Sequence, residues 1–448
     1  MSLDNLRHKI ENRSARIAVI GLGYVGIPVA CEFARVGFEV LGIDVRAKQV
    51  EMINAGRTPI TGKEPGLQEL ISEVILAGRL RATDDYDLLH DRDVILVCVE
   101  TPVKESREPD YTALRSALSG LAVSMKTGAL VIIESTIAPG TMQDVVVPEL
   151  ESASRKCLNE GFYLGNCPER VMPGKLLANL RNLSRVIGGM SEETAQVIRA
   201  LYSQFVQAEI DCTDCLTAEL VKTVENAYRD VQIAFANEVA LICETVGGDV
   251  WKVRELVNKS PGRMMLLPGA GVGGHCILKD PWLLAYSARK KGSAVELIPA
   301  ARKINDTMPD HMVSLVMQGL LTTGISVSQA HILVMGFTYL EDSDDTRNSP
   351  SAQLVNRLLE LGASVVIHDP YVSQYSGDLI QAARVCDLAV LMVKHGLYSS
   401  VDLARLSGIM RHSILVDGRA AFSRAQAERA GFRYIRIGMA NHLKDQGS

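Results

Sequence analysis

The sequence lacks the features of membrane, exported and nucleic-acid-binding proteins. No apolar run reaches the length of about 20 residues that a bilayer-spanning helix needs. Residues 1–16 are polar and charged, unlike the apolar core of a secretory signal. The formal net charge of -5 provides no basic surface of the kind that binds nucleic acid. We therefore expect a cytoplasmic protein with no membrane and no nucleic-acid partner.

The nine cysteines lack the pattern of a disulfide framework or a zinc site. Their number is odd and their spacing is irregular. Cys212 and Cys215 form a single CxxC, without the second pair of ligands that a structural zinc site needs. We expect no metal and interpret this CxxC as chance, with redox activity as the alternative.

What the sequence has is the composition of a soluble globular protein and an alternation of strand and helix patterns. Its 448 residues, 47% of them hydrophobic and 22% charged, are enough for two or three domains. Residues 16–20 and 39–43 read as strands and residues 27–36 as the helix between them. This order is the start of a dinucleotide-binding unit.

The turn after the first strand carries a GxGxxG motif, and an acid follows the second strand. Glycines at this turn admit a pyrophosphate at the helix N-terminus, and the acid accepts hydrogen bonds from the adenine ribose. The acid favours NAD, whereas the nearby Arg46 favours the 2′-phosphate of NADP. The residues assigned to NAD here are Gly21, Gly23, Tyr24, Val25, Gly26 and Asp44.

Two further apolar strands, 93–99 and 129–133, each lead to a threonine. Ligands in a doubly wound sheet sit beyond the carboxyl ends of the strands, so Thr101 and Thr136 are predicted to contact the cofactor. Either threonine alone could simply cap a helix. A third strand leads to a loop with Glu169 and Arg170, which suits an anionic, hydroxylated ligand, although a solvated loop is the alternative.

A long helix is predicted from about residue 217 to 246, because the pattern is helical with no proline or internal glycine. Lys222, Asn226 and Arg229 fall on one face at i, i+4 and i+7. This polar stripe suits an anionic sugar ligand. The other faces are mostly apolar, which predicts packing on both sides and hence a dimer.

The chain is organised around a glycine-rich stretch, residues 269–281, that leads to Cys276 and then Asp280. We interpret it as a loop that presents a thiol to substrate. The thiolate is the reactive form, and His275 or Lys279 are the cations that could promote it. The alternative is a buried, inert cysteine beside a turn.

A second α/β unit follows, with strands at 331–335, 364–369, 387–393 and 414–417 and no GxGxxG. It is Rossmann-like in order and is expected to bind a nucleotide other than NAD.

Six motifs of this chain occur together in one known family: residues 21–26, 134–136, 167–170, 222 with 226, 273–276 with 280, and 345–350. On these motifs the chain resembles the UDP-glucose/GDP-mannose dehydrogenase family along nearly its whole length. The resemblance implies an α/β fold with two Rossmann-like doubly wound domains joined by a central helical domain. The expected divisions are 1–205 for NAD, 206–312 for the central, dimer-forming domain with the cysteine loop, and 313–448 for the UDP-sugar.

The resemblance also implies oxidation of a sugar C6 alcohol to a carboxylate with two NAD, in polysaccharide biosynthesis. The motifs are nearer to the N-acetylhexosamine branch, so UDP-N-acetyl-D-mannosamine is the expected substrate, with UDP-N-acetylglucosamine or UDP-glucose as alternatives. More remote alternatives are a two-electron hydroxyacid dehydrogenase and a non-catalytic nucleotide-sugar binder.

The resemblance assigns roles to residues at matching positions. The expected catalytic residues are Cys276, Lys222, Asn226, Asp280, Glu169 and Thr136. Those expected to bind substrate are Arg170, Val171, Lys222, Asn226, Arg229, Arg263, Gly273, Tyr339 and Arg419, and Arg347 is assigned to the cofactor. Two positions depart from the family: Leu340 replaces a lysine, and Arg263 is shifted by one residue.

The mechanism that the resemblance implies has two oxidations. Lys222, or a water held by Asp280, takes the alcohol proton in the first. Cys276 then attacks the aldehyde, the second oxidation leaves a thioester, and water oriented by Asp280 and Glu169 hydrolyses it. Lys222 and Asn226 are expected to stabilise the oxyanions.

Overall fold

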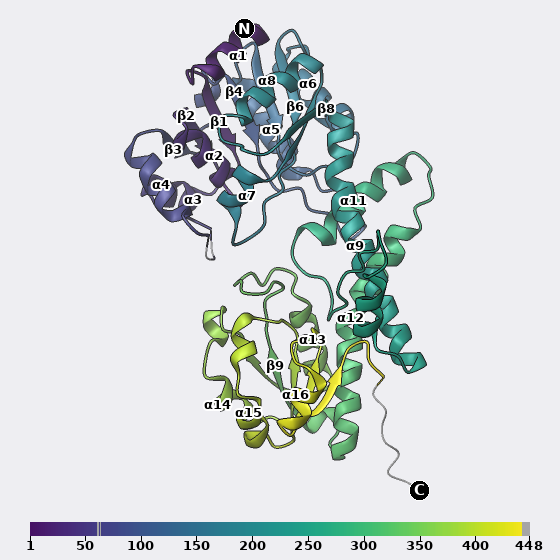
Figure 1. The fold of residues 1–448 in the computed structure, drawn as a ribbon. Coiled ribbons are helices and arrows are strands. Elements are labelled where there is room, and N and C mark those ends of the chain that lie inside the picture. The colour runs from purple at the N-terminus through teal and green to yellow at the C-terminus, as the bar shows by residue number, and fades with distance from the viewer. Residues whose placement is uncertain (61, 63, 441–448) are drawn as a thin grey trace. The chain divides into compact units, whose positions relative to one another are not determined.

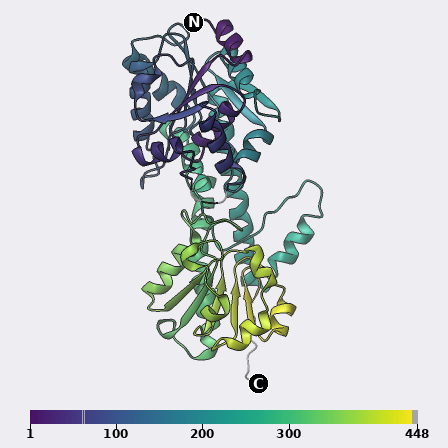
Figure 2. The same cartoon turned by 90° about the vertical axis from the view of Figure 1, so that its left-hand side faces the viewer.

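The computed structural model describes residues 1–440 apart from residues 61 and 63, and its internal contacts divide the chain into two compact units. The first consists of Met1–Glu225 with Lys279–Ala294, and the second of Asn226–Leu278 with the chain from Val295 onward. Each unit is built on one sheet flanked by helices, as Figure 1 and Figure 2 show.

The first unit contains an eight-stranded sheet in the order β3-β2-β1-β4-β5-β6-β7-β8. The described pairs are parallel except β6 with β7. The strand order reverses between β1 and β4, which is where doubly wound sheets bind ligands. The strands are β1 Arg16–Ile20, β2 Glu39–Ile43, β3 Leu80–Thr83, β4 Val94–Val97, β5 Ala129–Ile133, β6 Phe162–Asn166, β7 Arg185–Gly189 and β8 Ile210–Asp214.

Helices cover both faces of this sheet. Alternate residues of β1 point to opposite faces, so Ile17 and Val19 join one core cluster and Ala18 and Ile20 the other. Burial on both faces explains why these strands read as continuous apolar runs. The helices are α1 Leu3–Glu11, α2 Gly26–Arg35, α3 Ala47–Asn54, α4 Leu67–Leu76, α5 Thr112–Ser124, α6 Val147–Ser154, α7 Leu176–Asn182 and α8 Glu192–Tyr202, with a π-helical turn at Met142–Val146.

The second unit contains a five-stranded parallel sheet in the order β10-β9-β11-β12-β13. One core cluster joins it to α12 and α13, and another to α14, α15 and α16. The strands are β9 His331–Met335, β10 Ser364–His368, β11 Leu388–Leu391, β12 Ile414–Asp417 and β13 Arg433–Arg436. The helices are α10 Val250–Val257, α12 Leu297–Leu320, α13 Pro350–Glu360, α14 Leu379–Ala383, α15 Leu403–Ile409 and α16 Arg424–Arg429.

Two helices, α9 Cys215–Val246 and α11 Cys276–Lys290, carry residues of both units. The 32-residue α9 confirms the long helix expected from the sequence. Within the second unit it packs on α12 through buried polar side chains. Arg302 Nη1 lies 2.5 Å from Asp230 Oδ1, and the Asn237 amide donates to Asn305 at 2.9 Å.

The predicted fold class is confirmed, and the glycine-rich stretch differs from the sequence-based expectation. We expected a loop through residue 281, but the helix α11 begins at Cys276 itself. Lys279 and Asp280 are therefore helical residues, because the helix continues through Pro281. Among the helices of residues 1–440, none is both long and apolar enough to cross a bilayer.

Candidate active site

The turn between β1 and α2 has the shape that a dinucleotide requires. Gly21 has φ +89°, and a Cβ there would lie 2.8 Å from the Cys98 carbonyl oxygen. A Cβ on Gly26 would lie 1.8 Å from the Gly21 carbonyl oxygen. A Cβ on Gly23 would meet no atom within 4 Å, so this glycine leaves the approach to the turn open. The residues present fit a pyrophosphate at this turn.

Asp44 supplies the charge expected after β2. Its Oδ2 accepts a hydrogen bond from the Leu22 N–H at 2.9 Å, and Arg46 Nε donates to Oδ1 at 3.1 Å. Burial opposes ionisation, but the hydrogen bonds from Arg46 and Leu22 outweigh it and hold the pKa of Asp44 below its usual value. Arg46 therefore keeps Asp44 ionised, in the state that accepts hydrogen bonds from a ribose.

The two threonines predicted to lie at the carboxyl edge of the sheet are brought together by a hydrogen bond. Thr101 Oγ1 donates to the Thr136 carbonyl oxygen at 2.6 Å. Thr101 is buried and Thr136 is half-buried. The bond fixes the chain beyond β4 to the chain beyond β5, on the side of the sheet where the glycine turn also lies.

Glu169 lies in a buried ion pair that sequence reasoning missed. Its Oε2 is 2.7 Å from Nη2 of Arg185, the first residue of β7. Burial alone lowers the pKa of Arg185, but the negative charge of Glu169 raises it above its usual value. The Arg185 guanidinium also lies 4.9 Å from the centre of the Tyr202 ring.

A second carboxylate, Glu134, extends this buried cluster. It accepts a hydrogen bond from the Tyr202 hydroxyl, and Cys98 Sγ lies 3.7 Å from its Oε2. Burial raises the pKa of Glu134 to about 7, and the charge of Glu169 adds to this effect while Arg185 opposes it. Glu169 is thus the ion-pair partner of Arg185, and Glu134 is the carboxyl group of this cluster whose pKa lies near neutral pH.

The remaining residues assigned in the first unit differ in their burial and in their partners. Arg170 donates to Glu225 and to the Ser184 carbonyl oxygen, so it is bound within the unit. Val171 and Lys222 are half-buried. The fully buried Asp280 lies next to Lys279, whose Nζ is 2.6 Å from its Oδ1. Lys279, proposed from the sequence as a cation for the thiol, therefore already has a carboxylate partner.

In the second unit, the loop before Cys276 is clamped by residues 339–348. The Gly274 N–H donates to the Arg347 carbonyl oxygen at 3.0 Å, and the Asn348 amide donates to the Gly274 carbonyl oxygen at 3.0 Å. A Cβ on Gly273 or Gly274 would lie 2.5 or 2.7 Å from Tyr339. Glycine is required because the tyrosine covers the backbone, and the exposed Cys276 follows this fixed turn.

Arg419 holds the same loop from the other side. Its Nη2 donates to the Gly271 carbonyl oxygen at 3.3 Å, and its Nε donates to the Met392 carbonyl oxygen at 2.9 Å. Burial lowers the pKa of Arg419. The structure thus brings the assigned residues Gly273, Tyr339, Arg347 and Arg419 together around the loop. Asn226 and Arg229 lie on α9, and Arg263 is exposed beyond α10 and donates to the Pro261 carbonyl oxygen.

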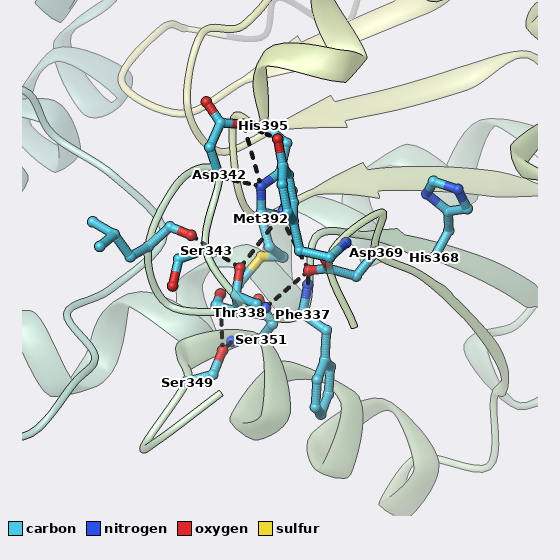
Figure 3. A network of polar contacts seen from close by, with 12 residues as sticks. Phe337, Thr338, Asp342, Ser343, Ser349, Ser351, His368, Asp369, Met392 and His395 are labelled. Atoms are coloured by element: carbon cyan, nitrogen blue, oxygen red, sulfur yellow. Dashed lines mark hydrogen bonds and ion pairs between the residues drawn. The ribbon is translucent and has the colours of Figure 1, made fainter. Parts of the chain in front are cut away.

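The clamping loop is anchored by a buried histidine–aspartate pair, shown in Figure 3. His395 Nδ1 accepts the Asp342 N–H at 3.0 Å, so the ring proton is on Nε2, which lies 3.1 Å from Asp369 Oδ2. The same oxygen accepts the N–H groups of Phe337 and Thr338 at 2.6 and 3.0 Å. Burial raises the pKa of Asp369, but these hydrogen bonds outweigh it and lower it to about 2.

The turns that follow β1 and β9, the first strand of each sheet in the chain, make the same kind of backbone hydrogen bond to the end of the next strand. The Gly21 N–H donates to Ile43 at 2.7 Å, and the Gly336 N–H donates to His368 at 2.8 Å. Asp369 stands where Asp44 stands in the first unit, after the second strand of its sheet. Asp369 is fully buried, however, and its carboxylate oxygens accept hydrogen bonds from groups within the second unit. The second unit therefore differs from the first at the position that would recognise a dinucleotide ribose.

Among the described residues, no group of three or more His, Cys, Asp or Glu side chains could hold a metal ion. Sequence reasoning missed Arg185, Tyr202 and His395. Each acts through a partner at least 16 residues away in the chain, so no local motif marks it.

Comparison with known proteins agrees with the geometry. Three models of the UDP-glucose/GDP-mannose dehydrogenase family match: the NAD binding domain at residues 15–206, the central domain at 216–307 and the UDP binding domain at 333–424. A UDP-N-acetyl-D-mannosamine dehydrogenase of Pyrococcus horikoshii is 40% identical over 406 residues, covering 90% of this chain and 95% of the relative.

Solved structures of relatives have the same fold. The structure of the Pyrococcus horikoshii UDP-D-ManNAc dehydrogenase matches with a TM-score of 0.88 at 39% identity, over 94% of this chain and 99% of that one. An NDP-N-acetyl-D-galactosaminuronic acid dehydrogenase from Methanosarcina mazei matches with a TM-score of 0.85 at 35% identity, over 99% of both chains. The chain therefore belongs to the UDP-glucose/GDP-mannose dehydrogenase family and is an NAD-dependent nucleotide-sugar dehydrogenase.

Proposed function

We propose that this dehydrogenase oxidises the C6 hydroxyl of UDP-N-acetyl-D-mannosamine to a carboxylate. One molecule of sugar, one of water and two of NAD⁺ give the uronate, two NADH and three protons. The observation that carries the proposal is the exposed Cys276 at the start of α11, behind a glycine turn that Tyr339 and Asn348 hold in place. The name of the Pyrococcus horikoshii relative supports the choice of sugar.

Bound NAD would accept the hydride in each oxidation, held by the glycine turn of residues 21–26 and by Asp44. In the first oxidation, Lys222 or a water bound by Asp280 removes the proton of the C6 hydroxyl. Amines and carboxylates serve as general bases when they lie within hydrogen-bond reach of the proton that they remove. Thr101 and Thr136 border the cofactor in this proposal, and their hydrogen bond keeps that border fixed.

Cys276 carries the second oxidation. Its thiolate attacks the aldehyde carbon and forms a carbon–sulfur bond, which gives a thiohemiacetal. Loss of hydride from this carbon leaves a thioester, and attack by water breaks the carbon–sulfur bond and releases the carboxylate. The N-terminus of a helix stabilises negative charge, so the start of α11 favours the thiolate.

Charged side chains assist these steps. Lys222 and Asn226 would donate hydrogen bonds to the oxyanions, an effect worth about 3 kcal/mol per donor. Asp280 and Glu169 would orient the hydrolytic water. Of the substrate residues, Arg170, Val171, Arg229 and Arg263 are proposed to bind the sugar or phosphates, and Gly273, Tyr339 and Arg419 to act through the loop that they form. Arg347 keeps its proposed role at the cofactor.

The proposed assembly is a homodimer in the cytoplasm, supplying a uronate donor for polysaccharide biosynthesis. The helix α9 exposes Tyr228, Phe235, Ile242 and Val246 by 63%, 58%, 52% and 73%. These residues recur at i, i+7, i+14 and i+18, which places them on one face of the helix. An apolar stripe of this kind supports association with a second copy, which the molecular mass in solution tests.

A panel of UDP-sugars assayed by NADH absorbance tests the function. The proposal predicts the highest kcat/KM for UDP-N-acetyl-D-mannosamine, with two NADH formed per sugar. One NADH per substrate would favour the two-electron hydroxyacid dehydrogenase, and binding of UDP-sugars without NADH would favour a non-catalytic binder. Preference for UDP-N-acetylglucosamine or UDP-glucose would change the substrate and keep the chemistry.

A further inference from the structure

A buried carboxylate on α9 has no part in the chemistry described above. Glu219 is 1% exposed, and its two oxygens accept backbone N–H groups of another segment. Gly140 donates to Oε2 at 2.6 Å and Met142 donates to Oε1 at 2.8 Å. Lys222 lies three residues further along the same helix, less than one turn away. Glu219 therefore ties the helix that carries Lys222 to the chain around residue 140.

The segment that Glu219 holds begins at Thr136, the residue proposed to border the cofactor. It follows β5 and runs into the π-helical turn Met142–Val146. Turns of this kind are frequent at functional sites. The segment also borders a cavity of about 420 Å³. The hydrogen bonds to Glu219 therefore add to the core packing of Ile137 and Met142 in holding the segment.

A second catalytic segment is tied to the same few residues. Ser287 Oγ, on α11, donates to the Pro139 carbonyl oxygen at 2.6 Å. Asp280 lies seven residues earlier on that helix, on the same face. Within the first unit, residues 137–142 are thus the point where Thr136, the helix of Lys222 and the helix of Asp280 are joined.

We infer that Glu219 is a positioning residue that fixes Lys222 and Thr136 relative to each other for the first oxidation. Ser287 fixes the helix of Asp280 to the same residues, 137–142, which we call the junction. The inference rests on the proposed function, because it concerns residues assigned there. A glutamate is needed because an ionised carboxylate offers two equivalent acceptors to two backbone donors. Glutamine offers one good acceptor, and its NH₂ group would face the second N–H.

The junction is expected to depend on pH. Burial raises the pKa of Glu219 to about 7, and the charges of Asp144 and Asp214 add to this effect while the N–H groups of Met142 and Gly140 oppose it. Cys215 and Tyr111 also interact electrostatically with the carboxylate, and Lys290 lies 3.6 Å from Asp144 Oδ2. When Glu219 gains a proton, one oxygen becomes a poor acceptor, and the wild type then resembles the glutamine variant.

The test compares kcat of the wild type and Glu219→Gln with UDP-N-acetyl-D-mannosamine across pH. We expect a ratio of about 10 well above pH 7, corresponding to about 1.4 kcal/mol, falling towards one well below pH 7. The Kd for NAD should stay within about threefold, since the glycine turn and Asp44 are untouched. Ser287→Ala should lower kcat by about threefold, and circular dichroism and the thermal unfolding midpoint verify that this half-buried variant is folded.

Glu32→Gln is the matched control, because Glu32 is a buried carboxylate of the same unit that pairs with Arg35 and Arg181 instead. It should lower thermal stability without a pH-dependent change in kcat. Amide hydrogen exchange supplies a readout free of turnover: the amides of Gly140 and Met142 should exchange at least about tenfold faster in Glu219→Gln.

The outcomes separate this inference from the function on which it rests. If the wild type is active but the ratio of its kcat to that of Glu219→Gln is below two well above pH 7, or does not change with pH, the role of Glu219 alone is overturned. Unchanged exchange at Gly140 and Met142 in the variant does the same. A wild type that forms no NADH with any UDP-sugar overturns the proposed function and this inference with it.

Discussion

Glu169 and Arg185 form an ion pair of 2.7 Å in which both side chains are buried. Glu169 follows β6 and Arg185 opens β7, so the pair ties two strand ends together beside the proposed site. Removing one charge of such a pair leaves the other buried without compensation, which is more damaging than losing a pair at the surface.

Glu169→Gln is therefore expected to destabilise the fold by about 3 kcal/mol and to slow thioester hydrolysis. Denaturant unfolding measures the first effect, and the rate of uronate release after the second NADH has formed measures the second. Glu360→Gln, which breaks an exposed pair with Arg357 on α13, is the control and should leave the unfolding midpoint unchanged. Equal stability of Glu169→Gln and wild type would contradict the importance of the buried pair.

The second prediction concerns pH and Glu134. Burial raises its pKa to about 7, with Glu169 adding to the rise, against an ordinary value of about 4.3 in the unfolded chain. The folded protein thus holds the proton more tightly. This contribution to stability is complete below about pH 4.3 and is lost as the pH rises through about 7.

Glu134→Gln removes this titration and keeps an acceptor for the Tyr202 hydroxyl. The loss of unfolding free energy between about pH 5 and about pH 8 should be smaller in the variant than in the wild type. Glu219, whose pKa burial also raises to about 7, contributes equally to both proteins. The same pH dependence in both would show that Glu134 stays ionised in the folded state.

Cofactor choice is expected to depend on the Asp44–Arg46 pair. Asp44→Ser removes the ribose acceptor and frees the guanidinium that now donates to it at 3.1 Å. We expect the Kd for NAD to rise by about tenfold and that for NADP to fall, since a free arginine accommodates a 2′-phosphate. Fluorescence titration measures both constants. In the double variant with Arg46→Gln the gain for NADP should vanish, and a gain that persists would exclude Arg46 as its source.

The buried pair of His395 and Asp369 is expected to control the loop before Cys276 (Figure 3). His395→Ala removes the acceptor of the Asp342 N–H and one donor to Asp369, so residues 339–348 should loosen. The KM for the UDP-sugar should rise by about tenfold. His331→Ala, at the amino end of β9, is the control and should leave KM unchanged. A normal KM in His395→Ala would mean that the loop holds without its anchor.

Local patterns predicted the parts of the site that are close together in the sequence. The glycine turn, Asp44 and the apolar strands were recognisable because a motif of 6 residues or a continuous apolar run defines each of them. The helix α9 was predictable because no proline or glycine interrupts it. Cys276 was recognised by the glycines that precede it. The start of α11 at that residue was not predicted, because Pro281 inside the helix made the stretch look like a loop.

The supporting residues could not be predicted because they act over long separations in the chain. Tyr202 reaches Glu134 across 68 residues, and Glu219 reaches Gly140 across 79. A buried carboxylate and an exposed one look the same in a sequence, and only the folded chain shows which backbone donors meet it. The hydrogen bond from Arg419 to the Gly271 carbonyl oxygen, across 148 residues, could not be predicted for the same reason.

The covalent role of Cys276 is the central claim, and the ratio of NADH formed to UDP-sugar consumed, in the wild type and in Cys276→Ser, tests it most directly. The account predicts a ratio of two for the wild type. It predicts almost no steady-state NADH from Cys276→Ser, because the first oxidation leaves an aldehyde that serine does not carry forward. Turnover of Cys276→Ser at the wild-type rate, with two NADH per sugar, would contradict it.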